Sequence, residues 1–88
     1  MANIKSQVKR NRQNEKRQER NKAVRSELKT RARNALEAAE AGEAERAALL
    51  LREAQQRFDV AASRGVLKKN TAARRKSRLT RQVRTLLG

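Results

Sequence analysis

Residues 42–65, GEAERAALLLREAQQRFDVAASRG, decide the fold of this chain of 88 residues. Apolar residues recur in this stretch at steps of four and three, the spacing that gathers side chains on one face of an α-helix. The stretch also begins and ends with glycine, the residue that most often closes a helix in the left-handed conformation. The pattern predicts an amphipathic helix whose buried face is centred on Ala47, Leu51, Ala54, Phe58 and Ala61. This face is widened by Ala48, Leu49, Leu50 and Ala62.

The two glycines divide the rest of the chain into further helical segments. There is no proline, and Ala, Arg, Lys, Glu, Gln and Leu dominate a composition that favours helices. We expect helices over about 3–41, 43–64 and 68–87. Because short links make neighbouring helices antiparallel, the sequence predicts an all-α fold, a three-helix bundle in a single domain over 1–88.

The third segment is predicted to be both a packing element and a cationic surface. Its first part, residues 68–79, reads KKNTAARRKSRL. Asn70 is a good candidate for the N-cap of this helix, because its side-chain oxygen can accept from the free amides of the first turn. On a helix that starts there, one face is apolar and the arginines lie on the others. That apolar face consists of Ala72, Leu79, Val83 and Leu86.

The first helix is predicted to be longer than its partners. A helix of 38 residues spans about 57 Å, whereas one of 21 residues spans about 32 Å. Folding back at Gly42 brings Leu28 opposite Phe58 and leaves the residues before about Arg20 without a partner. Since Lys9–Lys22 has no apolar residue, we expect this part to project from the bundle. A polar helix with no packing face is weak alone, so we expect residues 1–20 to be partly disordered until they bind a partner.

The charge of the chain is unevenly distributed. Lys and Arg number 24 against 9 acids, a net charge of +15. Residues 1–34 carry 12 bases and 3 acids, and residues 63–88 carry 9 bases and no acid. Residues 35–62 carry 3 bases and 6 acids. Such an excess typically indicates a polyanionic partner, and the acidic link around Gly42 is expected to point away from it.

The residue types exclude most catalytic chemistry. The chain has no Cys and no His, so thiolate or imidazole sites for metals and nucleophilic catalysis are absent. The four serines lack an evident base, and there is no glycine-rich phosphate loop. No apolar run is long enough to span a membrane, and the N-terminus lacks a signal-peptide core. We expect an intracellular, cytoplasmic protein that is not an enzyme and uses no cofactor or metal.

Nucleic-acid binding is the role that the composition favours. Without Tyr or Trp, and with Phe58 as the single aromatic residue, the chain has no stacking platform for single-stranded bases. Cations on rigid helices instead suit the phosphates of a double-helical or tightly folded nucleic acid. If about 6–10 cations contact phosphate, log affinity should fall with log salt concentration with a slope on the order of −5 to −9.

Two motifs carry a resemblance to a known family. The first is Ala2-Asn3-Ile4-Lys5-Ser6, followed by Lys9-Arg10. The second runs from Arg64 through Gly65-Val66-Leu67-Lys68-Lys69-Asn70 and on through Ala72-Ala73-Arg74-Arg75-Lys76-Ser77-Arg78-Leu79. Together they resemble the bacterial small-subunit (30S) ribosomal protein S-twenty family, and the match covers the chain from end to end. Lys68 stands where the family often has His, which keeps a cation at that position.

The resemblance implies a structural constituent of the ribosome that takes part in translation. It implies direct binding to 16S rRNA, at the 5′ domain and the lower part of the long penultimate helix, beside other 30S components, and stabilisation of the RNA fold during 30S assembly. Carried onto this chain, the RNA-binding candidates are Asn3, Lys5, Ser6, Lys9, Arg10, Arg12, Lys16, Arg17, Arg20, Lys68, Lys69, Asn70, Arg74, Arg75, Lys76, Ser77 and Arg78.

Two other classes of protein share some of these features. An architectural DNA-binding protein would make the same phosphate contacts, but the chain shows no wedge residue, no β-arm and no leucine heptad. A helix that binds a membrane surface needs a broad apolar face opposite its charges, and Lys9–Lys22 has none.

Overall fold

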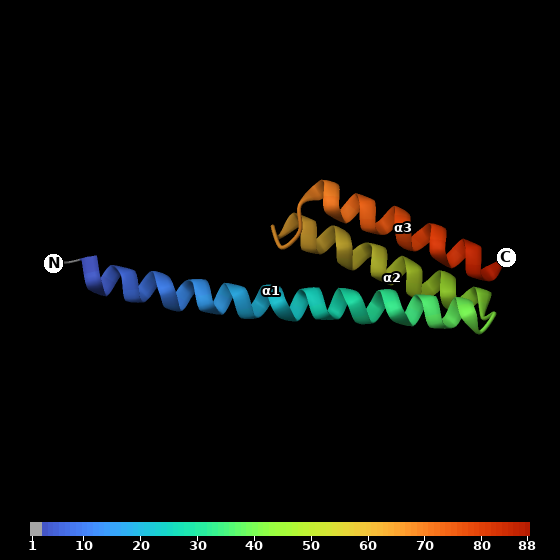
Figure 1. Ribbon diagram of the computed structural model, residues 1–88, viewed down its shortest axis with the longest axis horizontal. Coiled ribbons are helices and arrows are strands. Elements are labelled where there is room, and N and C mark those ends of the chain that lie inside the picture. Colours follow the sequence, from blue (N-terminus) through green and yellow to red (C-terminus); the bar gives the residue numbers. More distant parts are fainter. Residues whose placement is uncertain (1–2) are drawn as a thin grey trace.

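The computed structural model describes the backbone of residues 3–88 and the side chains of residues 12–88. The described chain contains three helices: α1 (Asn3–Glu40), α2 (Ala44–Ser63) and α3 (Lys69–Leu87). As Figure 1 shows, α2 runs antiparallel to α1, and α3 returns in the direction of α1. All three pairs of helices are in contact. The predicted all-α three-helix bundle is confirmed.

The link between α1 and α2 closes with a backbone motif that favours glycine. The Glu43 N–H donates to the Ala38 carbonyl at 3.0 Å, and the Gly42 N–H donates to the Ala39 carbonyl at 3.1 Å. This pair of bonds is a Schellman motif, and it places Gly42 at φ +76°. The same motif recurs at Gly65, where φ is +78°. Because the left-handed conformation ends the hydrogen-bond ladder, α1 and α2 each end one residue before their expected bounds.

The start of α3 differs from the prediction. Lys68, with φ −70° and ψ 144°, is the N-cap residue, and its carbonyl accepts from the Ala72 N–H at 2.9 Å. Asn70 lies inside the first turn, so its predicted role as N-cap was wrong. The reason is tertiary: Val66 and Leu67 pack against the core and bring the backbone into the helix before Asn70 is reached. No side-chain hydrogen bond caps this helix.

The core of the described bundle is made mostly of alanine. Leu28, Phe58 and Leu79 are its largest members, with 2%, 4% and 4% of their surfaces exposed. Alanine faces let helices approach closely, but each buries little area, so we expect modest stability. No polar or charged residue is buried among the described side chains. The buried residues are Leu28, Ala35, Ala38, Ala39, Ala47, Ala54, Phe58, Ala61, Ala72, Leu79 and Val83.

Several predicted packing residues are less buried than expected. Ala48 and Leu49 were expected to widen the buried face of α2, but both are exposed, because they lie at the edge of that face, away from α1 and α3. Leu51 on the α2 stripe is only partly buried, although it packs against the core. Leu86 on α3 is 42% exposed, whereas Leu79 and Val83 on the same face are buried. Leu86 lies in the last turn of α3, close to the end of the bundle, where less of the neighbouring helices remains to cover it.

The N-terminal part of α1 projects beyond the other two helices. Figure 1 shows α1 continuing past the α2–α3 link, and every described side chain from Arg12 to Arg20 is exposed. The predicted projection of the first helix is thus confirmed for the described residues. The backbone is helical from Asn3, and the ordering of residues 1–20 on binding stays a prediction. Within the described chain, no helix combines the length and apolar character needed to cross a membrane.

Candidate nucleic-acid interface

The projecting part of α1 has a basic side and a side that carries acids. At about 100° per residue, Arg17 lies about 20° from the direction in which Leu28 faces the core. Glu19 lies about 180° from that direction, on the outer side of the helix. Glu15 lies close to Glu19 on the same outer side. The side of α1 that faces the core therefore continues past the bundle as a cationic and amide surface.

The projection meets the end of the bundle at a corner. An open cleft of about 590 Å³ lies there, between α1 and the link that follows α2. No acidic residue lines it, and three of its residues are arginines. The lining residues are Arg17, Arg20, Asn21, Val24, Arg64, Gly65 and Val66. The corner thus joins the first basic block, residues 1–34, to the start of the second, residues 63–88.

Arg64 is a cation of this corner that the sequence motifs did not single out as a contact residue. It is the C-cap residue of α2, with φ −87° and ψ 0°, and its side chain is exposed. Its place directly before the helix-closing Gly65 was the available signal, because α2 runs antiparallel to α1 and therefore ends beside the projecting part of α1.

The candidates on α1 fall into two groups. Arg12, Lys16, Arg17 and Arg20 are exposed on the projection. The other candidates lie on the first turns of α1, and their side chains are outside the described residues. These are Asn3, Lys5, Ser6, Lys9 and Arg10.

The candidates on α3 are mostly exposed. Lys68 precedes the helix, and Lys69 and Asn70 lie in its first turn beside the α2–α3 link. One candidate differs from the rest, because Lys76 is partly buried and pairs with Asp59 of α2. The exposed members are Lys68, Lys69, Asn70, Arg74, Arg75, Ser77 and Arg78.

Most ion pairs of the described chain connect α2 with its neighbours. On the α1 side, Arg31 Nε lies 3.0 Å from Glu27 Oε1, and Arg31 Nη1 lies 3.5 Å from Glu53 Oε2. Arg57 Nε reaches the same Glu27 oxygen at 3.6 Å. Among the described cations, those in ion pairs are Arg31, Arg46, Arg57 and Lys76. The corner cations have no part in this network, so their charge is available to an external anion.

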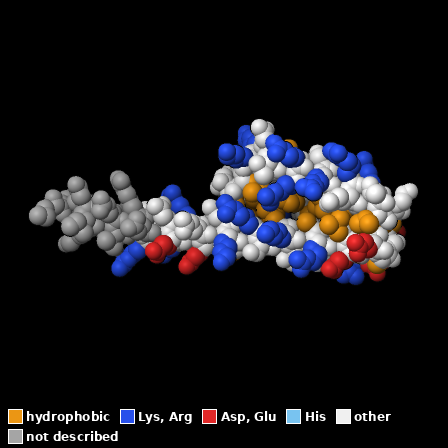
Figure 2. All heavy atoms as spheres, viewed as in Figure 1, with side chains coloured by type: hydrophobic (Ala, Val, Ile, Leu, Met, Phe, Trp, Pro, Cys, Tyr) orange, Lys and Arg blue, Asp and Glu red, His pale blue; other side chains and the backbone are white. Residues whose placement is uncertain are grey.

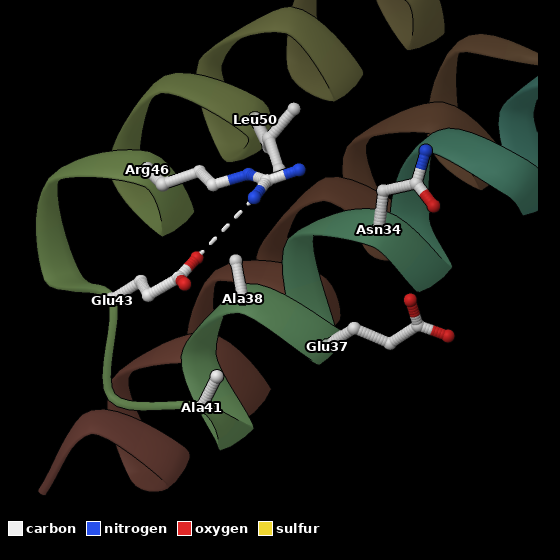
Figure 3. A pocket seen from close by; sticks show the side chains of 7 residues that line it. All are labelled: Asn34, Glu37, Ala38, Ala41, Glu43, Arg46 and Leu50. Carbon is white, nitrogen blue, oxygen red and sulfur yellow. Dashed lines mark ion pairs between the residues drawn. The ribbon is translucent and has the colours of Figure 1, made fainter.

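The opposite end of the bundle has a different character. A groove of about 330 Å³ lies there between α1 and α2 (Figure 3). Arg46 reaches from α2 toward Glu43, and Arg46 Nη1 lies 3.5 Å from Glu43 Oε2. Glu37 also lines this groove, and Glu40 and Glu45 follow nearby in the sequence. The acidic side chains at this end would repel phosphate. This agrees with the expectation that the acidic link points away from a polyanion, which stays a prediction.

The site has the chemistry of binding rather than of reaction. Within residues 12–88, no group of His, Cys, Asp and Glu side chains is arranged to hold a metal ion. The corner offers guanidinium groups, a carboxamide and an apolar floor of Val24 and Val66. Guanidinium groups make strong, charge-assisted hydrogen bonds to phosphate oxygens. The arrangement suits a polyanion with closely spaced phosphates.

The sequence was compared with protein families and with known proteins. The family model described as "Ribosomal protein S20" matches residues 2–84. The small ribosomal subunit protein bS20 of Salinispora tropica is 58% identical over 83 residues, which cover 94% of each chain. The bS20 protein of Streptomyces avermitilis is 54% identical over 88 residues, which cover both chains completely. The resemblance seen in the motifs is confirmed: the chain belongs to the ribosomal protein S20 family, whose members are structural ribosomal proteins and not enzymes.

Proposed function

We propose that this protein binds directly to 16S rRNA and stabilises its fold during assembly of the 30S subunit. Its relatives are named as proteins of the small ribosomal subunit, so its place is the cytoplasmic ribosome. The observation that carries the proposal is the corner between α1 and the α2–α3 link. Two basic blocks far apart in the sequence meet there, and no acid lines the cleft.

The corner acts by neutralising phosphates. A folded RNA that brings two backbone segments together suffers mutual repulsion, which cations held at fixed positions can offset. Arg17 and Arg20 are held by α1, while Arg64 is held by the end of α2. Since these elements belong to one bundle, the repulsion between the cations is overcome when the protein folds, before the RNA binds. The RNA-binding domain in this proposal is the whole of 1–88.

The shape of the protein supports contact with two separate parts of the RNA. The molecule measures 64 × 21 × 14 Å along its principal axes. The projection of α1 and the bundle can therefore reach RNA segments that lie well apart. We assign these segments to the 5′ domain and to the lower part of the long penultimate helix, with other 30S components alongside.

The residues proposed to contact RNA are those of the two motifs, with Arg64 added from the structure. On α1 they are Asn3, Lys5, Ser6, Lys9, Arg10, Arg12, Lys16, Arg17 and Arg20. After α2 they are Arg64, Lys68, Lys69, Asn70, Arg74, Arg75, Ser77 and Arg78. Lys76 also belongs to the motif, and its pairing with Asp59 makes it the weakest of these contacts.

Competition binding tests the proposal. Labelled 16S rRNA 5′ domain would be bound by the full chain and challenged with random duplex DNA and with an unrelated structured RNA, over a series of salt concentrations. We expect the ribosomal RNA to resist both competitors as salt rises, because shape recognition adds to the electrostatic attraction. If all competitors displace it equally and affinity collapses with salt, the basic blocks act without specificity and architectural DNA binding becomes the better account.

A further inference from the structure

Seen along its axis, α1 has one flank on each side of its buried residue Leu28. At about 100° per residue, Arg31 and Glu27 lie about 60° and 100° to one side of Leu28. Both pair with side chains of α2, so this flank faces α2. Arg25 and Lys29 lie at the same two angles on the other side of Leu28, and both are exposed. The second flank therefore faces away from α2 and carries cations.

The helix α3 repeats this arrangement around its buried residue Leu79. Lys76 and Thr80 lie about 60° and 100° to one side of Leu79, and both bond to side chains of α2. Gln82 and Arg78 lie at the same two angles on the other side, and both are exposed. The flank of α3 that faces away from α2 is therefore also polar and cationic.

These two outer flanks belong to one side of the molecule. The three helices contact one another pairwise, so the flanks of α1 and α3 that do not face α2 lie next to each other. We call this surface the α1–α3 face. Its exposed cations and amide are Lys22, Arg25, Lys29, Arg75, Arg78 and Gln82.

The α1–α3 face has no acidic residue along its middle. The flank of α1 that belongs to it carries no acid between Gln18 and Leu36, and α3 contains no acid at all. In Figure 2, Lys and Arg side chains lie on both sides of an apolar strip that runs between α1 and α3. The acidic side chains visible there lie along the lower edge of α1 and near the end that carries Gly42. By contrast, Glu27, Glu53 and Asp59 all serve ion pairs on the flanks of α2.

We propose that the α1–α3 face seats the phosphate backbone of the RNA, with Lys22, Arg25 and Lys29 as phosphate contacts outside those already assigned. This inference rests on the proposed function and adds the orientation of the bundle on its RNA. The outer side of α2 faces away from the RNA, because its charges are mixed in sign and partly paired. Charge complementarity selects RNA as the occupant, since a face with cations on both rims and no acid repels other basic surfaces.

Two matched triple variants of the full chain test the orientation. The face variant carries Lys22→Gln, Arg25→Gln and Lys29→Gln. The control variant carries Arg46→Gln, Arg52→Gln and Arg57→Gln, which removes the same charge from exposed positions of α2. Binding to the 16S rRNA 5′ domain would be measured over a salt series, and circular dichroism would check that both variants keep the helix content of the unsubstituted chain.

The expected results separate the two surfaces. The face variant should bind at least about tenfold more weakly at about 0.1 M salt, with a salt slope less steep by about 2 to 3, because each lost phosphate contact removes about 0.9 from the slope. The control variant should keep a slope within about 1 of the unsubstituted chain. Equal slopes for the two variants would overturn the assignment of the face while leaving the proposed function intact. Absence of binding by the unsubstituted chain would instead remove the proposed function, and the orientation with it.

A second measurement does not depend on affinity. The chain has no cysteine, so Arg25→Cys and Arg52→Cys each create a single attachment point for an iron chelate that cleaves nearby RNA. We expect cleavage of bound RNA from position 25, on the α1–α3 face, and weak or no cleavage from position 52, on the outer side of α2. Strong cleavage from position 52 with none from position 25 would place the RNA on the opposite side and overturn the inference.

Discussion

Lys76 of α3 donates a hydrogen bond to the carboxylate of Asp59 on α2, and among the described residues this is the one ion pair that joins these two helices. The Lys76 side chain is 30% exposed, whereas its neighbours Arg75 and Ser77 are exposed. By sequence alone, Lys76 and Arg75 are equivalent members of one basic block. Packing pairs Lys76 with Asp59 inside the protein, whereas Arg75 is exposed to solvent and to any bound partner.

This difference predicts unequal effects on RNA binding. We expect Arg75→Gln to make the salt slope for RNA binding less steep by about 1, because one phosphate contact is lost. Lys76→Gln should change the slope much less. It should lower the free energy of unfolding by at most about 1 kcal/mol, since the Asp59 side chain is 61% exposed and water screens the pair. Salt-dependent binding and chemical denaturation of both variants provide the check. A slope change for Lys76→Gln as large as that for Arg75→Gln would mean that Lys76 exchanges Asp59 for phosphate.

Removal of residues 1–20 should separate binding from folding. The bundle residues Leu28 and Phe58 remain in the truncated chain, so its thermal midpoint should stay close to that of the full chain. RNA affinity should fall on the order of a hundredfold or more at about 0.1 M salt, because much of the first basic block is lost. A truncated chain that no longer unfolds cooperatively would contradict the projecting geometry.

The same truncation tests the ordering of the projection on binding. If residues 1–20 are partly disordered in the free protein, circular dichroism should lose less signal on truncation than twenty helical residues supply. A loss equal to twenty helical residues would show that the segment is already fully helical without RNA.

Truncation of large core side chains should affect stability and spare the binding surface. Leu28→Ala and Phe58→Ala should each lower the free energy of unfolding by about 2–5 kcal/mol, because both side chains are buried and leave a cavity. Leu49→Ala is the control, since Leu49 is 55% exposed and should change stability by less than about 1 kcal/mol. Urea denaturation measures all three. A cost at Leu49 equal to that at Phe58 would show that the observed core is not the one that holds the bundle.

The alanine core should also resist enlargement. Ala54 is fully buried on α2, where extra methylene groups would force the helices apart. We expect Ala54→Leu to cost about 1–3 kcal/mol of stability, as overpacking usually does. Ala48→Leu, at an exposed position of the same helix, should be close to neutral. If Ala54→Leu stabilises the protein in denaturation experiments, the core contains space that the observed packing does not show.

The turn between α2 and α3 depends on the conformation of Gly65. A Cβ at this position would meet no atom within 4 Å, so the cost of Gly65→Ala comes from the backbone at φ +78°. That cost should be about 1–2 kcal/mol, and Gly65→Asn should cost less because asparagine tolerates the left-handed region. Thermal unfolding of the two variants would show which substitution lowers stability more. A milder effect for alanine than for asparagine would argue against the Schellman turn at this link.

Local pattern was sufficient for the elements of this fold. The absence of proline, the positions of Gly42 and Gly65 and the apolar spacing of α2 specify three helices, because each feature acts within one or two turns of the chain. The long polar run before Asn21 likewise specified a projection, since a segment with no apolar face has nothing to bury. The start of α3 was the exception: Asn70 has the local preference of an N-cap, yet the packing of Val66 and Leu67 starts the helix at Lys69.

The sequence by itself determined the all-α class, the order of the helices and the excess of positive charge, since these follow from residue type and short-range spacing. Only the tertiary structure decided which cations share a surface. Arg64 joins Arg17 and Arg20 at the corner although more than forty residues separate them along the chain. Lys76 is turned toward Asp59, while Arg78, two residues later, faces outward. Such groupings depend on how three helices are rotated about their axes, and that rotation is set by the burial of side chains from all three helices together.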